Sequence, residues 1–200
     1  GIYNTEDIEV NPIASFMKNL EEKNYTAKSI SRKTNAVRTF IKYLAKNGNI
    51  KEDISSQIKH PKFEINAPRI LTKMEYSALR DASRNDTRSY TMIALLLQTG
   101  ITISELAGIE LKDIEIKGDT GNLFIPKRNS KMERTVPLNK AAVEAIKKYI
   151  ENGRPKIENA VGNLFITKTG KPMLIRNIRS TIDRFFRTAG IEKAKVNDLR

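Results

Sequence analysis

The 200-residue sequence contains no cysteine and no tryptophan, and its only histidine is His60. The lack of cysteine excludes disulfides, a thiolate nucleophile and any zinc site built on cysteine. No apolar run approaches the roughly 20 residues that a membrane-spanning helix needs, and no signal peptide is recognisable. We therefore expect a cytoplasmic protein with no membrane partner.

Positive charge, by contrast, is abundant. The chain has 36 Lys+Arg against 23 Asp+Glu, a formal net charge of +13 and a pI near 9.9. The excess is uneven, because residues 1–68 have a net charge of +3 and residues 69–200 a net charge of +10. A charge of this size indicates a polyanionic partner such as nucleic acid. The alternative is a basic surface that is only solvated.

The start of the chain is predicted to form a small helical domain over residues 1–59. Asn11-Pro12 is typical of a helix start, a capping residue followed by proline at the first helical position. A longer helix is expected from Thr26 to Asn47, and a short one from Asp53 to Ile58. These helices would together make one domain.

The longer of these helices has two contrasting predicted faces. Its buried face consists of Ile30, Val37, Phe40, Ile41 and Leu44. Its opposite side carries polar and basic residues at alternating three- and four-residue steps: Lys28, Arg32, Asn35, Thr39, Lys42 and Lys46. Such a stripe is typical of a solvated helix face, and it would also suit contacts to a phosphate backbone.

A linker and a second domain are expected next. Residues 60–69 contain two prolines and no periodicity, which predicts an interdomain linker, with a second domain over residues 70–200. Thr72 and Glu75 form a capping-box pattern that opens the first helix of this domain. An apolar helix from Asp86 to Thr99 should lie in its core and end at Gly100, a residue that tolerates positive φ.

The pattern then changes to period two. Ile114–Ile116, Leu123–Ile125 and Thr135–Leu138 predict three antiparallel strands, the third at an edge because Pro137 cannot donate to a ladder. Further helices are expected after Asn139 and from about Arg176 to Ala189. The expected fold class is therefore mostly α with a small antiparallel β-sheet, a helical domain followed by an α+β domain.

One stretch carries more specific information. Residues 99–106 read Thr-Gly-Ile-Thr-Ile-Ser-Glu-Leu, which resembles the first active-site box of tyrosine recombinases, the phage integrase family with its Xer-like members, usually Thr-Gly-Leu-Arg-Ile-Ser-Glu-Leu. The resemblance continues through Leu111–Ile114, Pro126–Leu138 and Asn197–Arg200, nearly the whole chain. It implies a core-binding (SAM-like) DNA-binding domain over residues 1–59 and an integrase catalytic domain, truncated at its C-terminal end, over residues 70–200.

The resemblance also implies an activity. It points to a site-specific recombinase or integrase that binds duplex DNA in a two-domain clamp. Strands would be broken and rejoined through a 3′-phosphotyrosine intermediate, without a metal or another cofactor. Such a site needs fixed donors for the charge that develops at phosphorus, and the planar fork of arginine suits this task.

Carried over residue by residue, the family's catalytic positions fall on five residues of this chain. They are Thr102 (position of the first Arg), Glu105, Lys127, Asn197 (position of the His) and Arg200. Lys131 is the fallback for the lysine, because the length of this loop differs slightly from that of familiar members. The side chains of Thr102, Glu105, Lys127 and Arg200 are expected to converge on one pocket.

Two departures bear on activity. Thr102 offers a hydroxyl where the family has a guanidinium, and Asn197 cannot shuttle a proton. The nucleophilic tyrosine of the family lies beyond the position of Arg200, so we expect these 200 residues to be inactive alone. A second hypothesis is a catalytically inactive DNA-binding relative of integrases. A third is an unrelated basic helical protein that binds DNA or RNA.

The expected partner is double-stranded DNA, with self-association on DNA as the tetrameric synapse of the family and a location at the nucleoid. The residues expected to contact DNA come from both domains: Lys28, Arg32, Asn35, Lys42, Arg128, Lys131, Arg176 and Arg179.

Overall fold

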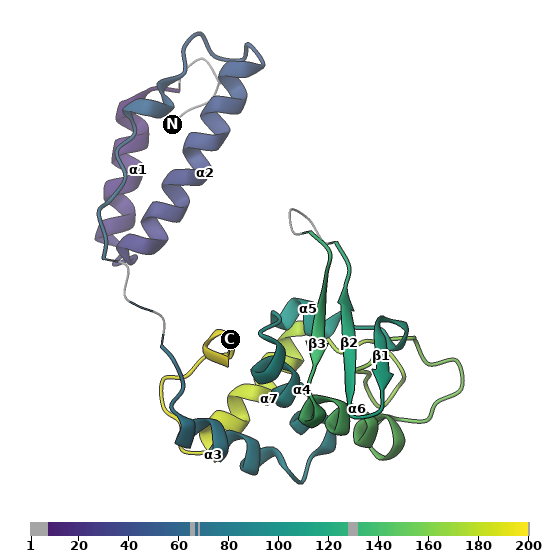
Figure 1. Ribbon diagram of the computed structural model, residues 1–200. Coiled ribbons are helices and arrows are strands. Elements are labelled where there is room, and N and C mark those ends of the chain that lie inside the picture. Colours follow the sequence, from purple (N-terminus) through teal and green to yellow (C-terminus); the bar gives the residue numbers. More distant parts are fainter. Residues whose placement is uncertain (1–7, 65–66, 68, 128–131, 200) are drawn as a thin grey trace. The chain divides into compact units, whose positions relative to one another are not determined.

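In the computed structural model the chain divides into two units, Gly1–Ala67 and Pro68–Arg200, each with its own hydrophobic core. The structure describes residues 8–64, 67, 69–127 and 132–199 (Figure 1). It is mostly helical with one small three-stranded antiparallel sheet, so the predicted fold class is confirmed.

The first unit contains α1 (Val10–Glu22), α2 (Ala27–Lys46) and a short 3₁₀ helix, η2 (Ile54–Gln57). Thr26, the expected first residue of the longer helix, is instead the N-cap of α2, and its side chain accepts the N–H of Ser29 at 3.3 Å. The predicted start of the first helix at Asn11 is slightly wrong. The helix begins at Val10, so Pro12 lies in the first turn, where an N–H would have no partner within the helix anyway.

The two faces of α2 are those expected, with one exception. Ile30, Ile41 and Leu44 are buried, but Phe40 is 54% exposed, so its predicted burial is wrong. Thr34 takes a buried place instead, and its hydroxyl donates to the carbonyl of Ile30 at 2.9 Å. The polar stripe is exposed throughout, at Lys28, Arg32, Asn35, Thr39, Lys42 and Lys46.

The second unit is built around one buried helix. Its elements are α3 (Lys73–Ser83), α4 (Thr87–Thr99), α5 (Ile103–Ala107), η3 (Leu111–Asp113), β1 (Ile114–Lys117), β2 (Thr120–Ile125), β3 (Arg134–Leu138), α6 (Lys140–Asn152), α7 (Ile175–Thr188) and η4 (Val196–Leu199). The central helix is α4, which contacts α3, α6 and α7. Met92, Leu95 and Leu96 in α4 are completely buried, which agrees with the apolar run Met92–Leu97 in this helix.

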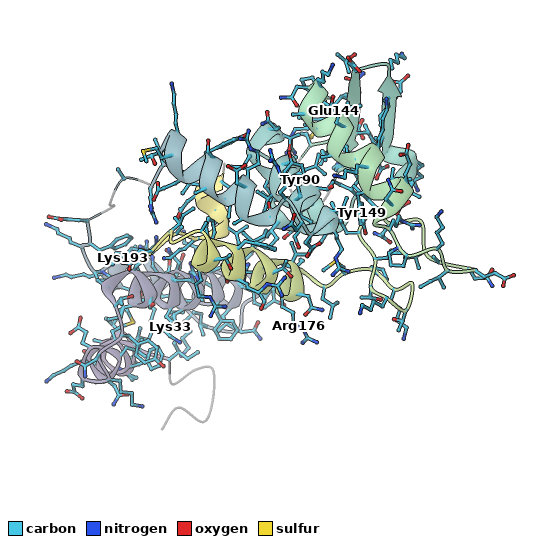
Figure 2. All side chains as sticks on the ribbon, turned by 90° about the horizontal axis from the view of Figure 1, so that it is seen from below. Lys33, Tyr90, Glu144, Tyr149, Arg176 and Lys193 are labelled. Atoms are coloured by element: carbon cyan, nitrogen blue, oxygen red, sulfur yellow. The ribbon has the colours of Figure 1, made fainter. Side chains whose placement is uncertain are left out.

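Polar contacts fix the ends and the side of α4. Asp86 caps its start, and Gly100 ends it with a φ of 62°, a conformation that glycine adopts without strain. The hydroxyl of Thr91 donates to the carbonyl of Ala145 at 2.9 Å and so ties α4 to α6. Tyr149 of α6 (Figure 2) is entirely buried and stacks on Phe165, with ring centroids 5.3 Å apart.

The sheet has the order β1-β2-β3, and both pairings are antiparallel. The prediction that the strand with Pro137 lies at an edge is confirmed. Leu123, Ile125 and Leu138 face the core, where α6 packs against β2 and β3. In the β2–β3 register Arg134 lies opposite Ile125, which places the first residue of β3 beside the end of β2.

The last long helix, α7, has the predicted amphipathic pattern. Ile178, Ile182, Phe185 and Phe186 are buried, and Arg176, Arg179, Arg184 and Arg187 are exposed. Because α7 contacts both α5 and η4, it links the helix after Thr102 to the segment that contains Asn197. Val196 and Leu199 are buried and anchor η4.

Candidate active site

The turn between α4 and α5 is held by a reciprocal pair of hydrogen bonds. Thr102 is the N-cap of α5, and its hydroxyl accepts the N–H of Glu105 at 3.2 Å. In return, the Glu105 carboxylate accepts the N–H of Thr102 at 2.7 Å. This is a complete capping box, which satisfies two backbone donors at the helix start. The Thr-x-x-Glu spacing is the same signal as at Thr72–Glu75 and would have predicted it.

A third residue, Arg134, completes the group. Its two terminal nitrogens donate to the two oxygens of Glu105, Nη1 to Oε1 at 2.8 Å and Nη2 to Oε2 at 3.1 Å. The Glu105 side chain is 6% exposed and that of Arg134 is 39% exposed. A buried carboxylate therefore holds a partly exposed guanidinium in a fixed, forked geometry.

These contacts set the charge of the pair. The side-chain hydrogen bonds from Arg134 lower the pKa of Glu105 to about 2, and the backbone N–H of Thr102 acts in the same direction, while burial opposes them. The hydrogen bonds to Glu105 raise the pKa of Arg134 further above its ordinary value. Both groups therefore stay ionised near neutral pH, and the guanidinium remains a permanent cation.

Not all of the predicted catalytic positions can be compared. Thr102 and Glu105 lie together, as described above. Lys127 is exposed and comes two residues after Ile125, the strand partner of Arg134, so it lies at the same end of the sheet. Asn197 is an exposed residue of η4. Arg200 lies outside the described residues.

Arg134 is the residue that sequence reasoning missed. It stands at the end of a basic segment, residues 127–134, in which several side chains could have served equally well. Its partner Glu105 is 29 positions away, so the contact depends on how β3 pairs with β2 and packs near α5. The resemblance to the family includes the segment Pro126–Leu138, but it does not single out Arg134 within that segment.

The predicted DNA contacts are exposed wherever the structure describes them. Lys28, Arg32, Asn35 and Lys42 share one face of α2, and Arg176 and Arg179 lie on the solvent side of α7. Arg128 and Lys131 lie outside the described residues. The contacts to DNA therefore remain predictions.

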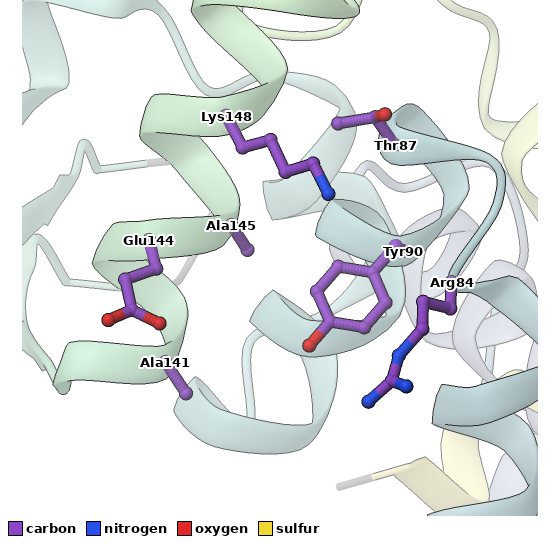
Figure 3. A pocket seen from close by; sticks show the side chains of 7 residues that line it. All are labelled: Arg84, Thr87, Tyr90, Ala141, Glu144, Ala145 and Lys148. Carbon is purple, nitrogen blue, oxygen red and sulfur yellow. The ribbon is translucent and has the colours of Figure 1, made fainter.

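Within the ranges that the structure describes, no cluster of three His, Asp or Glu residues could hold a metal ion. The same ranges contain no helix with the length and apolarity to cross a membrane. A separate hollow of about 260 Å³, lined by residues that include Arg84, Tyr90 and Lys148, lies where α3 and α4 meet α6 (Figure 3). Thr102, Glu105 and Arg134 do not line this hollow.

Comparison with known proteins identifies the family of this chain. The sequence model described as "Phage integrase family" matches residues 69–200. Tyrosine recombinase XerC of Natranaerobius thermophilus is 28% identical over 209 residues, which cover 100% of this chain and 69% of the relative. Tyrosine recombinase XerD of Listeria monocytogenes serotype 4b is 26% identical and covers 96% of this chain and 66% of the relative. The chain thus spans about two thirds of the length of the curated relatives it matches.

Solved structures give the same result for the fold. A lambda integrase dimer bound to a COC′ core site aligns with a TM-score of 0.74 at 16% identity, over 98% of this chain and 69% of that chain. The XerH site-specific recombinase bound to difH substrate, a pre-cleavage complex, aligns with a TM-score of 0.72 at 17% identity, over 96% and 58%. With the family match covering more than half of its length, this chain belongs to the phage integrase family of tyrosine recombinases.

Proposed function

We propose that this protein binds duplex DNA and, as part of the complete enzyme, breaks and rejoins DNA strands through a 3′-phosphotyrosine intermediate. The observation that carries the proposal is the group Thr102–Glu105–Arg134, in which a buried carboxylate holds a cation at the surface of a strongly basic unit. Fixed cations of this kind stabilise the charge that develops at phosphorus during strand cleavage.

In the proposed reaction a tyrosine oxygen loses its proton and attacks phosphorus. The bond from phosphorus to the 5′-oxygen breaks, and that oxygen takes up a proton. We assign the proton donation to Lys127 and a hydrogen bond to a phosphate oxygen to Asn197, both of which are exposed. Arg200 would be the second clamp on the phosphate. The family carries its nucleophile downstream of the Asn197–Arg200 motif, so cleavage is proposed for the complete protein.

The proposed DNA contacts are mostly to phosphates. Lys28, Arg32 and Lys42 supply a row of exposed cations on α2, while Arg176 and Arg179 supply another on α7. Each unit would contribute its own surface to the same duplex, which corresponds to a two-domain clamp. We further propose that copies associate on DNA as a tetrameric synapse, and that the protein works on the nucleoid in the cytoplasm.

A second candidate function is that of a catalytically inactive DNA-binding relative. The observation in its favour is that Thr102, an uncharged side chain whose hydroxyl oxygen accepts the N–H of Glu105 in the helix cap, stands at the position of the first arginine. Asn197 likewise has no proton to transfer. Both candidates require duplex binding, and they differ only in the chemistry that follows.

Binding is tested by titrating the 200-residue chain with duplex DNA at several salt concentrations. We expect the logarithm of the affinity to fall steeply with the logarithm of the salt concentration, and the slope to shrink by about 0.9 for each phosphate contact removed. The double variant Arg32→Ala/Lys42→Ala should show a smaller slope. The control Lys18→Ala/Lys59→Ala removes the same charge from a different face of the same unit. A flat salt response, or equal losses in both double variants, would contradict the proposal.

Chemistry is tested on a nicked suicide substrate with the protein extended by the downstream segment of its own gene, if that segment encodes a tyrosine. A covalent 3′-phosphotyrosyl adduct supports the enzyme. Duplex binding without any adduct, over a range of pH, supports the inactive relative.

A further inference from the structure

The ion pair between Arg134 and Glu105 differs from the other salt bridges of the described residues. The other carboxylates are at least a quarter exposed, whereas the Glu105 side chain is 6% exposed. Removing a carboxylate from water is costly unless strong hydrogen bonds compensate. Glu75 holds Arg69 in a similar way, but its side chain is 25% exposed, so among the described ion pairs only Glu105 fixes an arginine from a buried position.

The pairing leaves one side of the guanidinium available. Arginine has five N–H donors in a rigid plane, and the contact through Nη1 and Nη2 uses only two of them. Of the three that remain, the Nε–H and the second Nη2–H point in parallel, an arrangement that matches two oxygens of a phosphate. Among the described residues Glu105 is the only hydrogen-bond partner of Arg134, whose side chain is 39% exposed.

The position of this guanidinium is equally specific. The Nη2 of Arg134 and the backbone N–H of Thr102 donate to the same atom, Oε2 of Glu105. The guanidinium therefore lies one shared acceptor away from the residue at the first-arginine position. Thr102 itself carries no positive charge, and its hydroxyl oxygen accepts the N–H of Glu105 within the cap.

We propose that Arg134 is a catalytic residue that binds the scissile phosphate and supplies, from β3, the guanidinium that Thr102 cannot supply. This inference rests on the proposed function, because it requires DNA as the substrate. Glu105 then has a defined task, since it holds the fork at one end and leaves the other end to the phosphate. The arginine needs no reorganisation when DNA arrives, which is the condition under which such donors are most effective.

The first test measures binding to duplex DNA by the 200-residue chain. Arg134→Ala should reduce the salt slope by about 0.9, the value for one lost phosphate contact. The control Arg84→Ala removes an exposed arginine beside the separate hollow of Figure 3 and should leave the slope unchanged. If the wild-type chain does not bind duplex DNA, the proposed function fails. If it binds and Arg134→Ala has the wild-type slope, this inference fails while the proposed function stands.

The second test is a rescue in the extended protein on the nicked suicide substrate. Arg134→Ala should slow adduct formation by about 10²- to 10³-fold, the usual effect of losing one preorganised donor. Adding Thr102→Arg to this variant should raise the rate of adduct formation at least tenfold, because the new guanidinium would stand at the neighbouring position. A merely structural role of Arg134 predicts no rescue, so its absence would overturn the proposal.

The Arg134→Ala variant leaves Glu105 buried without its partner, and it could fail to fold. Arg134→Lys is therefore measured in parallel, because it keeps the charge and one hydrogen bond but replaces the fork by a point charge. It should retain the melting temperature better than Arg134→Ala while still losing at least tenfold in adduct formation. Adduct formation at the wild-type rate in Arg134→Lys would also count against the proposal.

Discussion

Thr102 and Glu105 each accept the backbone N–H of the other, at 3.2 Å and 2.7 Å respectively. Thr102 therefore has a structural task that is independent of any substrate. The threonine at this position is accounted for by helix capping, and it carries no positive charge.

The first prediction concerns this cap. Thr102→Ala should lower the free energy of unfolding by about 1 kcal/mol, the usual cost of losing an N-cap, and Thr102→Ser should restore most of it. The matched control is Thr72→Ala in the capping box of α3, which should cost a similar amount. Urea denaturation followed by circular dichroism measures all three variants. A Thr102→Ala variant as stable as the wild type would show that the cap contributes nothing.

The second prediction concerns acid stability. The pKa of Glu105 is lowered from 4.5 to about 2 in the folded protein, chiefly by Arg134. A lowered pKa means that the unfolded state binds the proton more tightly, so the stabilisation is complete above about pH 4.5 and is lost as the pH falls towards 2. The depression corresponds to about 3 kcal/mol.

The measurement is the free energy of unfolding between pH 6 and pH 2 for the wild type and for Glu105→Gln. The glutamine variant should be less stable at pH 6, and the difference should shrink as the pH falls. Glu144→Gln changes an exposed glutamate of α6 and serves as the control. If the free energy of unfolding has the same pH dependence in the wild type and in Glu105→Gln, the lowered pKa of Glu105 is refuted.

The third prediction concerns the buried tyrosine of α6. Burial raises the pKa of the Tyr149 hydroxyl, and although the backbone of Ile166 lies nearby, this hydroxyl forms no hydrogen bond within the described chain. Tyr149→Phe should therefore change stability by less than about 1 kcal/mol, because it removes a buried polar group without a partner. Tyr149→Ala should cost about 3–5 kcal/mol through the cavity it leaves beside Phe165. Thermal melts of the two variants test this prediction. A large loss of stability in Tyr149→Phe would contradict it, because it would show that the hydroxyl forms a stabilising hydrogen bond.

The fourth prediction concerns the backbone contact between β1 and β2. A Cβ placed on Gly121 would lie 2.4 Å from the carbonyl oxygen of Glu115 and 3.3 Å from the Cα of Ile116, both backbone atoms that cannot turn aside. Gly121→Ala should cost about 1–3 kcal/mol through forced separation of the strands. Gly162→Ala is the control, because open space surrounds that position. Similar melting temperatures for the two variants would contradict the strand geometry.

Much of the fold was predictable because the signals are local. Asp86 and Gly100 mark the two ends of α4 through a cap and a positive φ, and both are properties of single residues. The strand with Pro137 could be placed at an edge for the same reason. Phe40 shows the limit of this reasoning. Helical periodicity places it beside Ile41, but only the size of the small N-terminal unit determines how wide a face is covered.

The candidate site likewise contains residues that the sequence could predict and one that it could not. Glu105 and Thr102 could be located from a short motif, because four consecutive residues define both the box and the cap. Arg134 could not, since its role depends on the pairing of β2 with β3 and on the packing of that sheet near α5. A contact across 29 positions is a property of the tertiary structure, and no local pattern records it.

Pro137 in β3 has a consequence for the behaviour of the protein in solution. A strand at the margin of a sheet offers a template on which a second chain can add, and this is a common route to aggregation. The ring nitrogen of Pro137 has no hydrogen to offer such a chain, so one rung of any added ladder stays empty. Growth by strand addition at this margin, along β3, is thereby disfavoured.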